Sequence, residues 1–88
     1  MSLTVVGRLS IEGYDKFAES FASRAEARAA AGLELKAYRN VDDPNQVVII
    51  GTVPSKEALM GFISTPEQQE AMKTAGIQGP PDITFLEG

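Results

Sequence analysis

Three consecutive polar residues, Tyr38, Arg39 and Asn40, are the part of this 88-residue chain best suited to chemistry. A phenol, a guanidinium and an amide can all donate hydrogen bonds to negative charge that develops on an oxygen atom. Thr52 and Gln46 add hydrogen-bonding groups from the next predicted strand. We therefore take Tyr38, Arg39, Asn40 and Thr52 as candidate ligand-binding residues, and we assign no catalytic residue.

Arg39 is the central candidate, because its guanidinium shares a strand face with apolar residues and needs a partner there. The functional interpretation is that Arg39 anchors an acidic or enolic ligand. The structural alternative is an ion pair with Asp42, with Asp43 or with a glutamate of a second subunit. Tyr38 has a comparable alternative, as an amphipathic aromatic residue on a strand.

The composition removes several kinds of site. The chain has no cysteine and no histidine, which excludes disulfides, thiolate nucleophiles, Cys/His zinc sites, histidine-ligated haem and histidine general bases. Asp42 and Asp43 resemble a metal pair, but they are followed by Pro44 and Asn45 and are better explained as turn residues. We expect neither a metal nor a cofactor.

The charge and the apolar runs limit the partners and the location. The net charge is −4 and the eight basic residues are scattered, so we expect no nucleic-acid partner. The longest strongly apolar run, residues 47–50, is too short to cross a membrane, and the first ten residues lack the features of a signal peptide. A cytoplasmic protein with no membrane partner is expected.

The apolar periodicity predicts six elements, all within one domain over residues 1–88. Branched residues predict strands at 3–10, 33–40, 46–53 and 82–88, and helical spacing predicts helices over 10–31 and 55–75. Gly32 is expected to end the first helix, and Ser55 to cap the second. The second helix restarts at Thr65, where Pro66 and Gln68 complete a T-x-x-Q capping box. Arg28, on the apolar stripe of the first helix, is expected to lay its stem over the sheet.

The order β-α-β-β-α-β predicts an α+β, ferredoxin-like fold: a four-stranded antiparallel sheet with two helices on one face. The third strand is apolar on both sides, because Val47, Val48, Ile49 and Ile50 are consecutive. Two helices cover one face, so the other face is expected to pack against a second copy through a two-fold axis. The alternative is that branched residues suit strands and tolerate exposure.

The stretch from residue 38 to the end resembles a known family. It is similar to small bacterial proteins of the dimeric α/β-barrel superfamily, which includes the antibiotic-biosynthesis-monooxygenase domains. The segments that carry the resemblance are Tyr38-Arg39, Asp42-Asp43-Pro44-Asn45, Ser64 to Met72, Ala75-Gly76-Ile77 and Phe85-Leu86-Glu87. The resemblance implies two ferredoxin-like subunits whose sheets face each other around a partly hollow barrel.

Members of the superfamily include cofactor-free oxygenases, haem-degrading enzymes, isomerases and polyketide cyclases. The haem-degrading members use a histidine, a tryptophan and an asparagine, and this chain has no histidine and no tryptophan. Two hypotheses follow. In the first, a homodimer binds a small hydrophobic or enolic molecule in the barrel without a catalytic metal or haem. In the alternative, the protein is a cofactor-independent monooxygenase or a polyketide-cyclase-like enzyme, in which Tyr38, Arg39 and Asn40 polarise the substrate oxygen.

Overall fold

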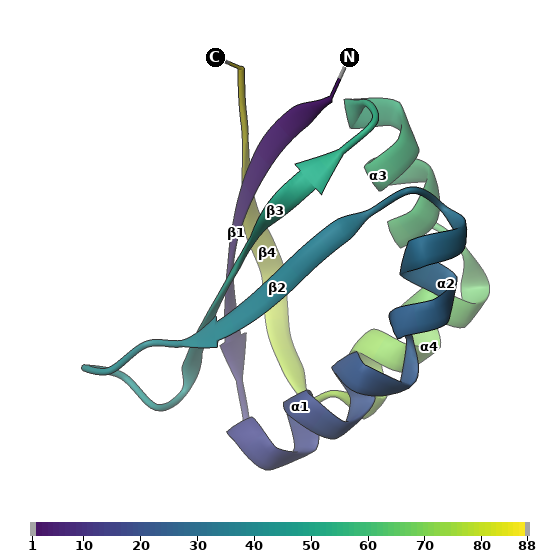
Figure 1. Cartoon of the computed structure of the whole chain (residues 1–88). Coiled ribbons are helices and arrows are strands. Elements are labelled where there is room, and N and C mark those ends of the chain that lie inside the picture. Colours follow the sequence, from purple (N-terminus) through teal and green to yellow (C-terminus); the bar gives the residue numbers. More distant parts are fainter. Residues whose placement is uncertain (1, 88) are drawn as a thin grey trace.

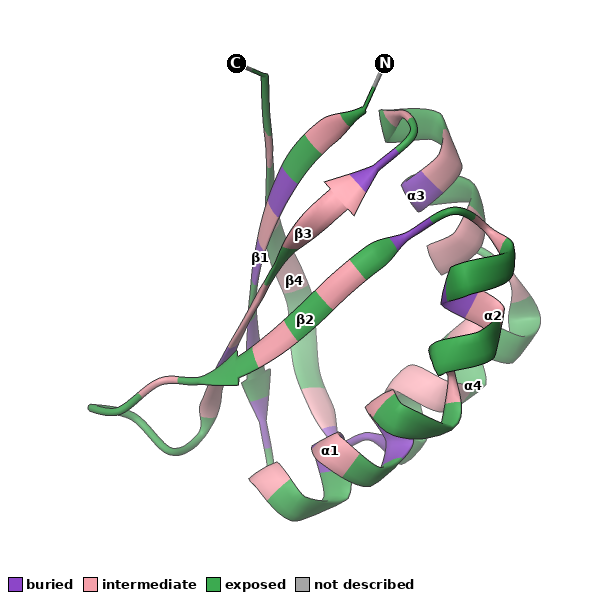
Figure 2. Cartoon of the chain, viewed as in Figure 1, coloured by how far each residue is buried: buried purple, intermediate pink, exposed green. Residues whose placement is uncertain are grey.

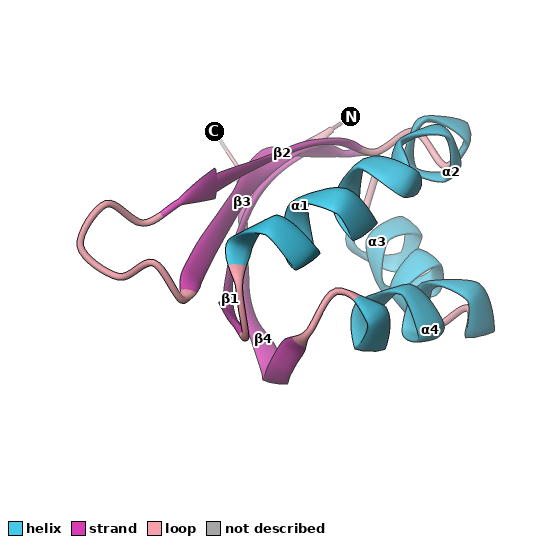
Figure 3. Ribbon diagram, turned by 90° about the horizontal axis from the view of Figure 1, so that it is seen from below, coloured by secondary structure: helices cyan, strands magenta, loops and turns pink. Residues whose placement is uncertain are grey.

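A computed structural model describes residues 2–87 and has the predicted element order, with each helical segment divided in two (Figure 1). The strands are β1 (Leu3–Ile11), β2 (Glu34–Arg39), β3 (Gln46–Val53) and β4 (Ile77–Leu86). The helices are α1 (Tyr14–Ser23), α2 (Ala25–Ala30), α3 (Lys56–Ile63) and α4 (Pro66–Thr74). The strands form one antiparallel sheet in the order β2-β3-β1-β4, and all the helices lie on one side of it (Figure 3). The predicted ferredoxin-like α+β fold is confirmed.

The sheet has one covered and one uncovered face, and the apolar strand β3 contributes to both. Val47 faces the helices and is fully buried, whereas Ile50 lies on the opposite face and is 43% exposed. Buried and exposed segments are both present along β3 (Figure 2). In register with Ile50 are Val6 of β1 and Lys36 of β2, so these residues share the uncovered face. The consecutive apolar residues of β3 therefore supply a core on one side and an exposed apolar strip on the other.

The core between the sheet and the helices consists of two clusters of buried residues. One cluster lies near the start of α1 and the end of α4, and it contains Leu9, Ile11, Phe17, Val47 and Ala75. The other lies beneath α3 and contains Val5, Leu33, Val53 and Leu59. Because β1 and β3 each contribute to both clusters, these two central strands connect the two ends of the core.

The first predicted helix is interrupted at Arg24, which separates α1 from α2. Two carbonyl groups before the break have additional partners. The Ser23 hydroxyl donates to the Ser20 carbonyl at 2.6 Å, and the Phe21 carbonyl accepts both from Arg24 N–H at 3.2 Å and from the Arg28 guanidinium at 2.7 Å. Side-chain bonds to backbone carbonyls compete with the regular helical ladder and bend helices. The bend places Arg24 and Arg28 above the sheet.

The predicted helix caps are present, with one difference at Gln68. The Ser55 hydroxyl accepts from the backbone N–H three residues later at 3.0 Å, and the Thr65 hydroxyl accepts from the Gln68 N–H at 3.3 Å. A capping box also requires the Gln68 side chain to accept from the Thr65 N–H. That N–H instead donates to the Phe62 carbonyl at 3.2 Å, and the Gln68 side chain turns to Arg24.

The closing strand begins earlier than predicted, at Ile77 rather than at residue 82. Ser10 pairs with Gln78, but Arg8 pairs with Asp82, so residues 79–81 form an irregularity in the ladder. Gly79 has a φ of +75°, and the prolines that follow it are tolerated because β4 is an edge strand. Gly88 of the predicted strand lies outside the described residues. No helix within residues 2–87 is long and apolar enough to cross a membrane.

Candidate functional site

The structure places the four predicted site residues on different faces and at different ends of the sheet. Tyr38 projects from the uncovered face and is 51% exposed, whereas Arg39 projects from the face that the helices cover. The Arg39 guanidinium lies 5.1 Å from the centre of the Tyr14 ring. Within residues 2–87 it has no carboxylate partner, so the suggested ion pairs with Asp42 and Asp43 are absent from the described chain.

The side chains of Asn40 and Thr52 are engaged within the chain. The Asn40 amide donates to the Gln46 side chain at 2.6 Å, and its oxygen accepts from the Asp42 N–H at 2.8 Å. The Thr52 hydroxyl donates to the Glu34 carboxylate at 3.2 Å, at the other end of the sheet. Arg39 and Asn40 border a surface depression beside the β2–β3 turn, but none of the four residues reaches the internal cavity.

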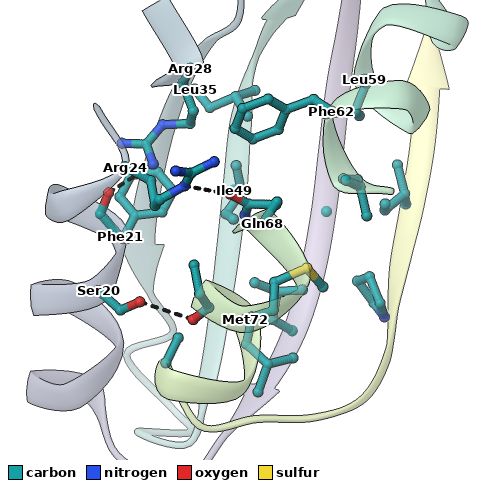
Figure 4. A pocket seen from close by; sticks show the side chains of 18 of the residues that line it. Ser20, Phe21, Arg24, Arg28, Leu35, Ile49, Leu59, Phe62, Gln68 and Met72 are labelled. Carbon is teal, nitrogen blue, oxygen red and sulfur yellow. Dashed lines mark hydrogen bonds between the residues drawn. The ribbon is translucent and has the colours of Figure 1, made fainter. Parts of the chain in front are cut away.

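An apolar cavity of about 100 Å³ lies between the sheet and the helices (Figure 4). Its floor is formed by the covered faces of the strands and its walls by α1, α3 and α4. The apolar side chains that line it include Leu9, Phe17, Phe21, Leu35, Ile49, Phe62, Met72 and Ile83. The volume is of the same order as the ~150 Å³ apolar cavities that bind benzene.

Gly7 in the middle of β1 helps to keep this space empty. It lies on the covered face between Ile49 of β3 and Ile83 of β4. A Cβ atom at this position would lie 3.9 Å from Ile83 Cγ1, which is an ordinary contact. The backbone there would accept a side chain, so the absence of one leaves space at the centre of the core.

One corner of the cavity is polar and is formed by Arg24, Arg28 and Gln68, while Ser20 joins α1 to α4 nearby (Figure 4). Arg24 Nε donates to Gln68 Oε1 at 3.0 Å. The Ser20 hydroxyl donates to the Ala71 carbonyl at 3.0 Å. These two bonds hold α4 against the first helical segment and close one side of the cavity.

The electrostatics of this corner are unusual, because two arginines meet without a carboxylate. Arg28 is 8% exposed, and the one ion pair within residues 2–87 joins Lys16 to Glu12 elsewhere on the surface. Burial lowers the pKa of the Arg28 guanidinium, and the positive charge of Arg24 lowers it further. Arginine keeps its proton at any pH at which proteins fold, so this lowered pKa is a constant cost to stability rather than a pH-dependent one.

Sequence reasoning missed this corner, although it contains a signal. Arg28 was expected to lie over the sheet, and Gln68 was explained by capping alone. Arg24 and Arg28 are four residues apart on the apolar stripe, and neither has an acidic residue three or four positions away to pair with. Two unpaired arginines on a buried helix face indicate a polar partner from another segment or from outside the chain.

No group of three or more acidic, histidine or cysteine side chains within the described residues is arranged to hold a metal ion. No family model matches the sequence, and no curated protein does either.

Solved structures share the fold over nearly the whole chain. A Bordetella bronchiseptica protein with the provisional description of antibiotic biosynthesis monooxygenase is 14% identical, with a TM-score of 0.82 over 99% of this chain and 96% of its own. SnoaB, a cofactor-independent oxygenase from Streptomyces nogalater, is 19% identical, with a TM-score of 0.76 over 99% of this chain and 92% of its own. A conserved protein from Methanosarcina mazei is 14% identical, with a TM-score of 0.75 over 97% of this chain and 90% of its own.

Likeness at such low identity establishes architecture, and function is argued from the site. This chain has the ferredoxin-like α+β fold of the antibiotic biosynthesis monooxygenase proteins.

Proposed function

We propose that this protein binds a small hydrophobic or enolic molecule in the cavity between the sheet and the helices, without a catalytic metal or haem. The observation that carries the proposal is the apolar cavity of about 100 Å³ with its single polar corner of Arg24, Arg28 and Gln68. Ligand sites in proteins are concave, mostly apolar and supplied with a few convergent polar groups. A molecule that binds the folded chain and not the unfolded one also stabilises the fold.

This location differs from the space between two sheets at which the sequence resemblance pointed. Tyr38 and Thr52 project from the uncovered face, so they would contact a ligand held between two subunits. Arg39 and Asn40 would contact a ligand beside the β2–β3 turn. Ligand contact by these four residues, one domain over residues 1–88 and a cytoplasmic location all stay predictions.

Native mass spectrometry of protein purified without added ligand, followed by titration with small aromatic molecules, tests the cavity directly. We expect the wild type to retain or bind such molecules. Gly7→Val places a side chain that suits a strand at the centre of the cavity, where its Cβ atom would lie 3.9 Å from Ile83 Cγ1. We therefore expect this variant to lose at least about tenfold in affinity, a loss of about 1.4 kcal/mol, while keeping its melting temperature.

Gly61→Ala is the matched control. Gly61 is exposed on α3, and a Cβ atom there would meet nothing within 4 Å. This substitution should leave ligand affinity unchanged. Equal affinity of Gly7→Val and the wild type would place the ligand elsewhere and overturn the cavity proposal.

We also propose that the protein is a homodimer that pairs through the uncovered face of the sheet. This face exposes Tyr38, Ile50 and Leu86, which are 51%, 43% and 46% exposed. An apolar strip across a four-stranded sheet is self-complementary when a two-fold axis crosses it. Sedimentation equilibrium measures the subunit number, and a monomer at all concentrations tested would contradict the proposal.

A second candidate function is a cofactor-independent oxygenase or a cyclase. The observation that favours it is the likeness to SnoaB, together with two arginines positioned to stabilise an enolate or phenolate oxygen. Oxygen uptake in the presence of a one-ring phenol measures the first activity. If the protein binds the phenol but takes up no oxygen, the oxygenase function is contradicted and the binding function is kept.

A further inference from the structure

The polar corner of the cavity carries more positive charge than the chain itself neutralises. Arg24 and Arg28 both border the apolar space, and within residues 2–87 no carboxylate lies within 4.0 Å of either guanidinium. The protein as a whole is acidic, with a net charge of −4. Carboxylates are therefore abundant in the chain but are absent from the place where two cations meet.

The Arg28 guanidinium is fixed in position but incompletely bonded. Its Nη1 donates to the Phe21 carbonyl at 2.7 Å, and its plane lies over the Phe21 ring with the central carbon 3.6 Å from the ring centre. An arginine has five N–H donors, so most of those on Arg28 have no protein acceptor. The aromatic ring supports the cation without satisfying its hydrogen bonds.

Arg24 is held in the same manner on the other side of the corner. Its Nε donates to Gln68 at 3.0 Å, and its central carbon lies 5.6 Å from the centre of the Phe62 ring. Within the described residues, no fully buried side-chain nitrogen lacks a hydrogen bond. The guanidinium nitrogens of Arg24 and Arg28 that make no hydrogen bond are therefore not fully buried, and both side chains border the cavity (Figure 4).

A planar anion fits this arrangement better than a neutral group. A carboxylate accepts two parallel hydrogen bonds from a guanidinium, and such charged pairs are about twice as strong as neutral ones. The proximity of two like charges and the burial of Arg28 are unfavourable in the empty protein, as the lowered pKa of Arg28 indicates. An anion bound at this corner would offset the repulsion between the two charges and would supply hydrogen-bond acceptors to the buried guanidinium.

We propose that the Arg24–Arg28 corner binds the carboxylate of a small apolar acid whose ring or short chain fills the cavity. This inference rests on the proposed function, because it names the class of ligand that the cavity takes. The cavity volume of about 100 Å³ limits the apolar part to about one ring. The competing explanation is that both arginines are structural and serve only to stack on Phe21 and Phe62.

Three probes that share a phenyl ring and differ in their polar end separate these explanations: phenylacetate, its isostere phenylacetamide and the phenethylammonium ion. Their affinities for the wild-type protein are measured by calorimetry. We expect phenylacetate to bind at least about tenfold more tightly than phenylacetamide, because one charged hydrogen-bond pair gives a factor of this order. We expect the phenethylammonium ion to bind most weakly, because its charge repels the two arginines.

Arg24→Gln tests the corner itself. This variant should lower the affinity for phenylacetate by about tenfold and leave that for phenylacetamide unchanged. Lys73→Gln makes the same change in net charge at an exposed position of α4, and it should change neither affinity. Arg24→Lys keeps the charge without the planar fork, and it should fall between the wild type and Arg24→Gln.

The outcomes distinguish this inference from the proposal on which it rests. Equal binding of the acid and the amide to the wild type would keep the cavity as a ligand site and overturn the carboxylate inference. Binding of none of the three probes, with no molecule retained in native mass spectra, would overturn both. These comparisons on the wild type hold even if an arginine variant fails to fold.

Discussion

Gln68 Oε1 accepts a hydrogen bond from Arg24 Nε at 3.0 Å, so a carboxylate placed at this position would act as a built-in substitute for an acidic ligand. Gln68→Glu changes the chemistry and keeps the shape. We expect this variant to stabilise the protein by about 1 kcal/mol. The new carboxylate would form an ion pair with the half-buried guanidinium of Arg24, which has no carboxylate partner in the described chain. We also expect it to weaken phenylacetate binding, because the corner is already neutralised.

Gln78→Glu is the control for this substitution, because Gln78 is exposed on β4 and does not line the cavity. Thermal unfolding measures the stability of both variants, and calorimetry measures their affinity. If Gln68→Glu binds phenylacetate as tightly as the wild type does, the prediction is contradicted, and the arginines do not bind the carboxylate of the ligand.

Residue types in the sequence indicated some of the candidate site residues but did not indicate which of them lie together. Tyr38 and Arg39 are adjacent in sequence, but a strand directs successive side chains to opposite faces, so adjacency is a poor guide to a shared site there. Arg24 and Gln68 are far apart in sequence and meet through the packing of α1 against α4. A contact of this kind depends on tertiary structure and has no local signature.

At the scale of elements, β2 and β3 approach so closely at Gly51 that no side chain fits. A Cβ atom at Gly51 would overlap the Glu34 carbonyl oxygen and would lie 2.8 Å from Leu35 Cα, both of which are backbone atoms. Neither can move without breaking the ladder between the strands. We expect Gly51→Ala to destabilise the protein by about 3 kcal/mol, at the upper end for overpacking.

Gly7→Ala is the comparison for this prediction, because its Cβ atom would meet Ile83 at an ordinary 3.9 Å. Urea denaturation of the two variants gives their free energies of unfolding. We expect Gly7→Ala to lie within about 1 kcal/mol of the wild type, since Gly in a strand carries an entropic cost that Ala removes. Similar losses in both variants would show that β1 and β3 tolerate side chains equally.

Element order follows from apolar periodicity and capping, which is why the ferredoxin-like fold could be predicted. The boundaries that differ have specific causes. The break at Arg24 follows from the hydrogen bonds that Ser23 and Arg28 make to carbonyls of α1. The early start of β4 follows from its pairing with the end of β1, which tolerates the irregularity at residues 79–81. Both depend on partners that periodicity alone does not identify.

At the scale of the whole molecule, the two faces of the sheet have separate tasks. The covered face holds the cavity and its charged corner, and the uncovered face presents the apolar strip that we assign to a second subunit. Changes on one face should therefore leave the other unaffected. This separation lets oligomeric state and ligand binding be tested independently. A substitution on the uncovered face should change the oligomeric state alone.

Ile50→Glu tests the uncovered face. Position 50 lies opposite Lys36 on β2, so the new carboxylate gains an opposite-charge neighbour and the subunit keeps its fold. In a dimer the same carboxylate would be buried against an apolar strip, which is strongly unfavourable. We expect the dimer to dissociate at concentrations at which the wild type stays paired, as measured by sedimentation equilibrium, with phenylacetate affinity unchanged.

Met60→Glu is the matched control, because Met60 is also 43% exposed but lies on α3, away from the uncovered face. It introduces the same charge at the same degree of exposure, so a general effect of charge on association would appear in both variants. Dissociation in Ile50→Glu alone would locate the interface on the sheet. Equal subunit numbers in all three proteins would mean that the apolar strip tolerates water, and the consecutive branched residues of β3 would then reflect strand preference alone.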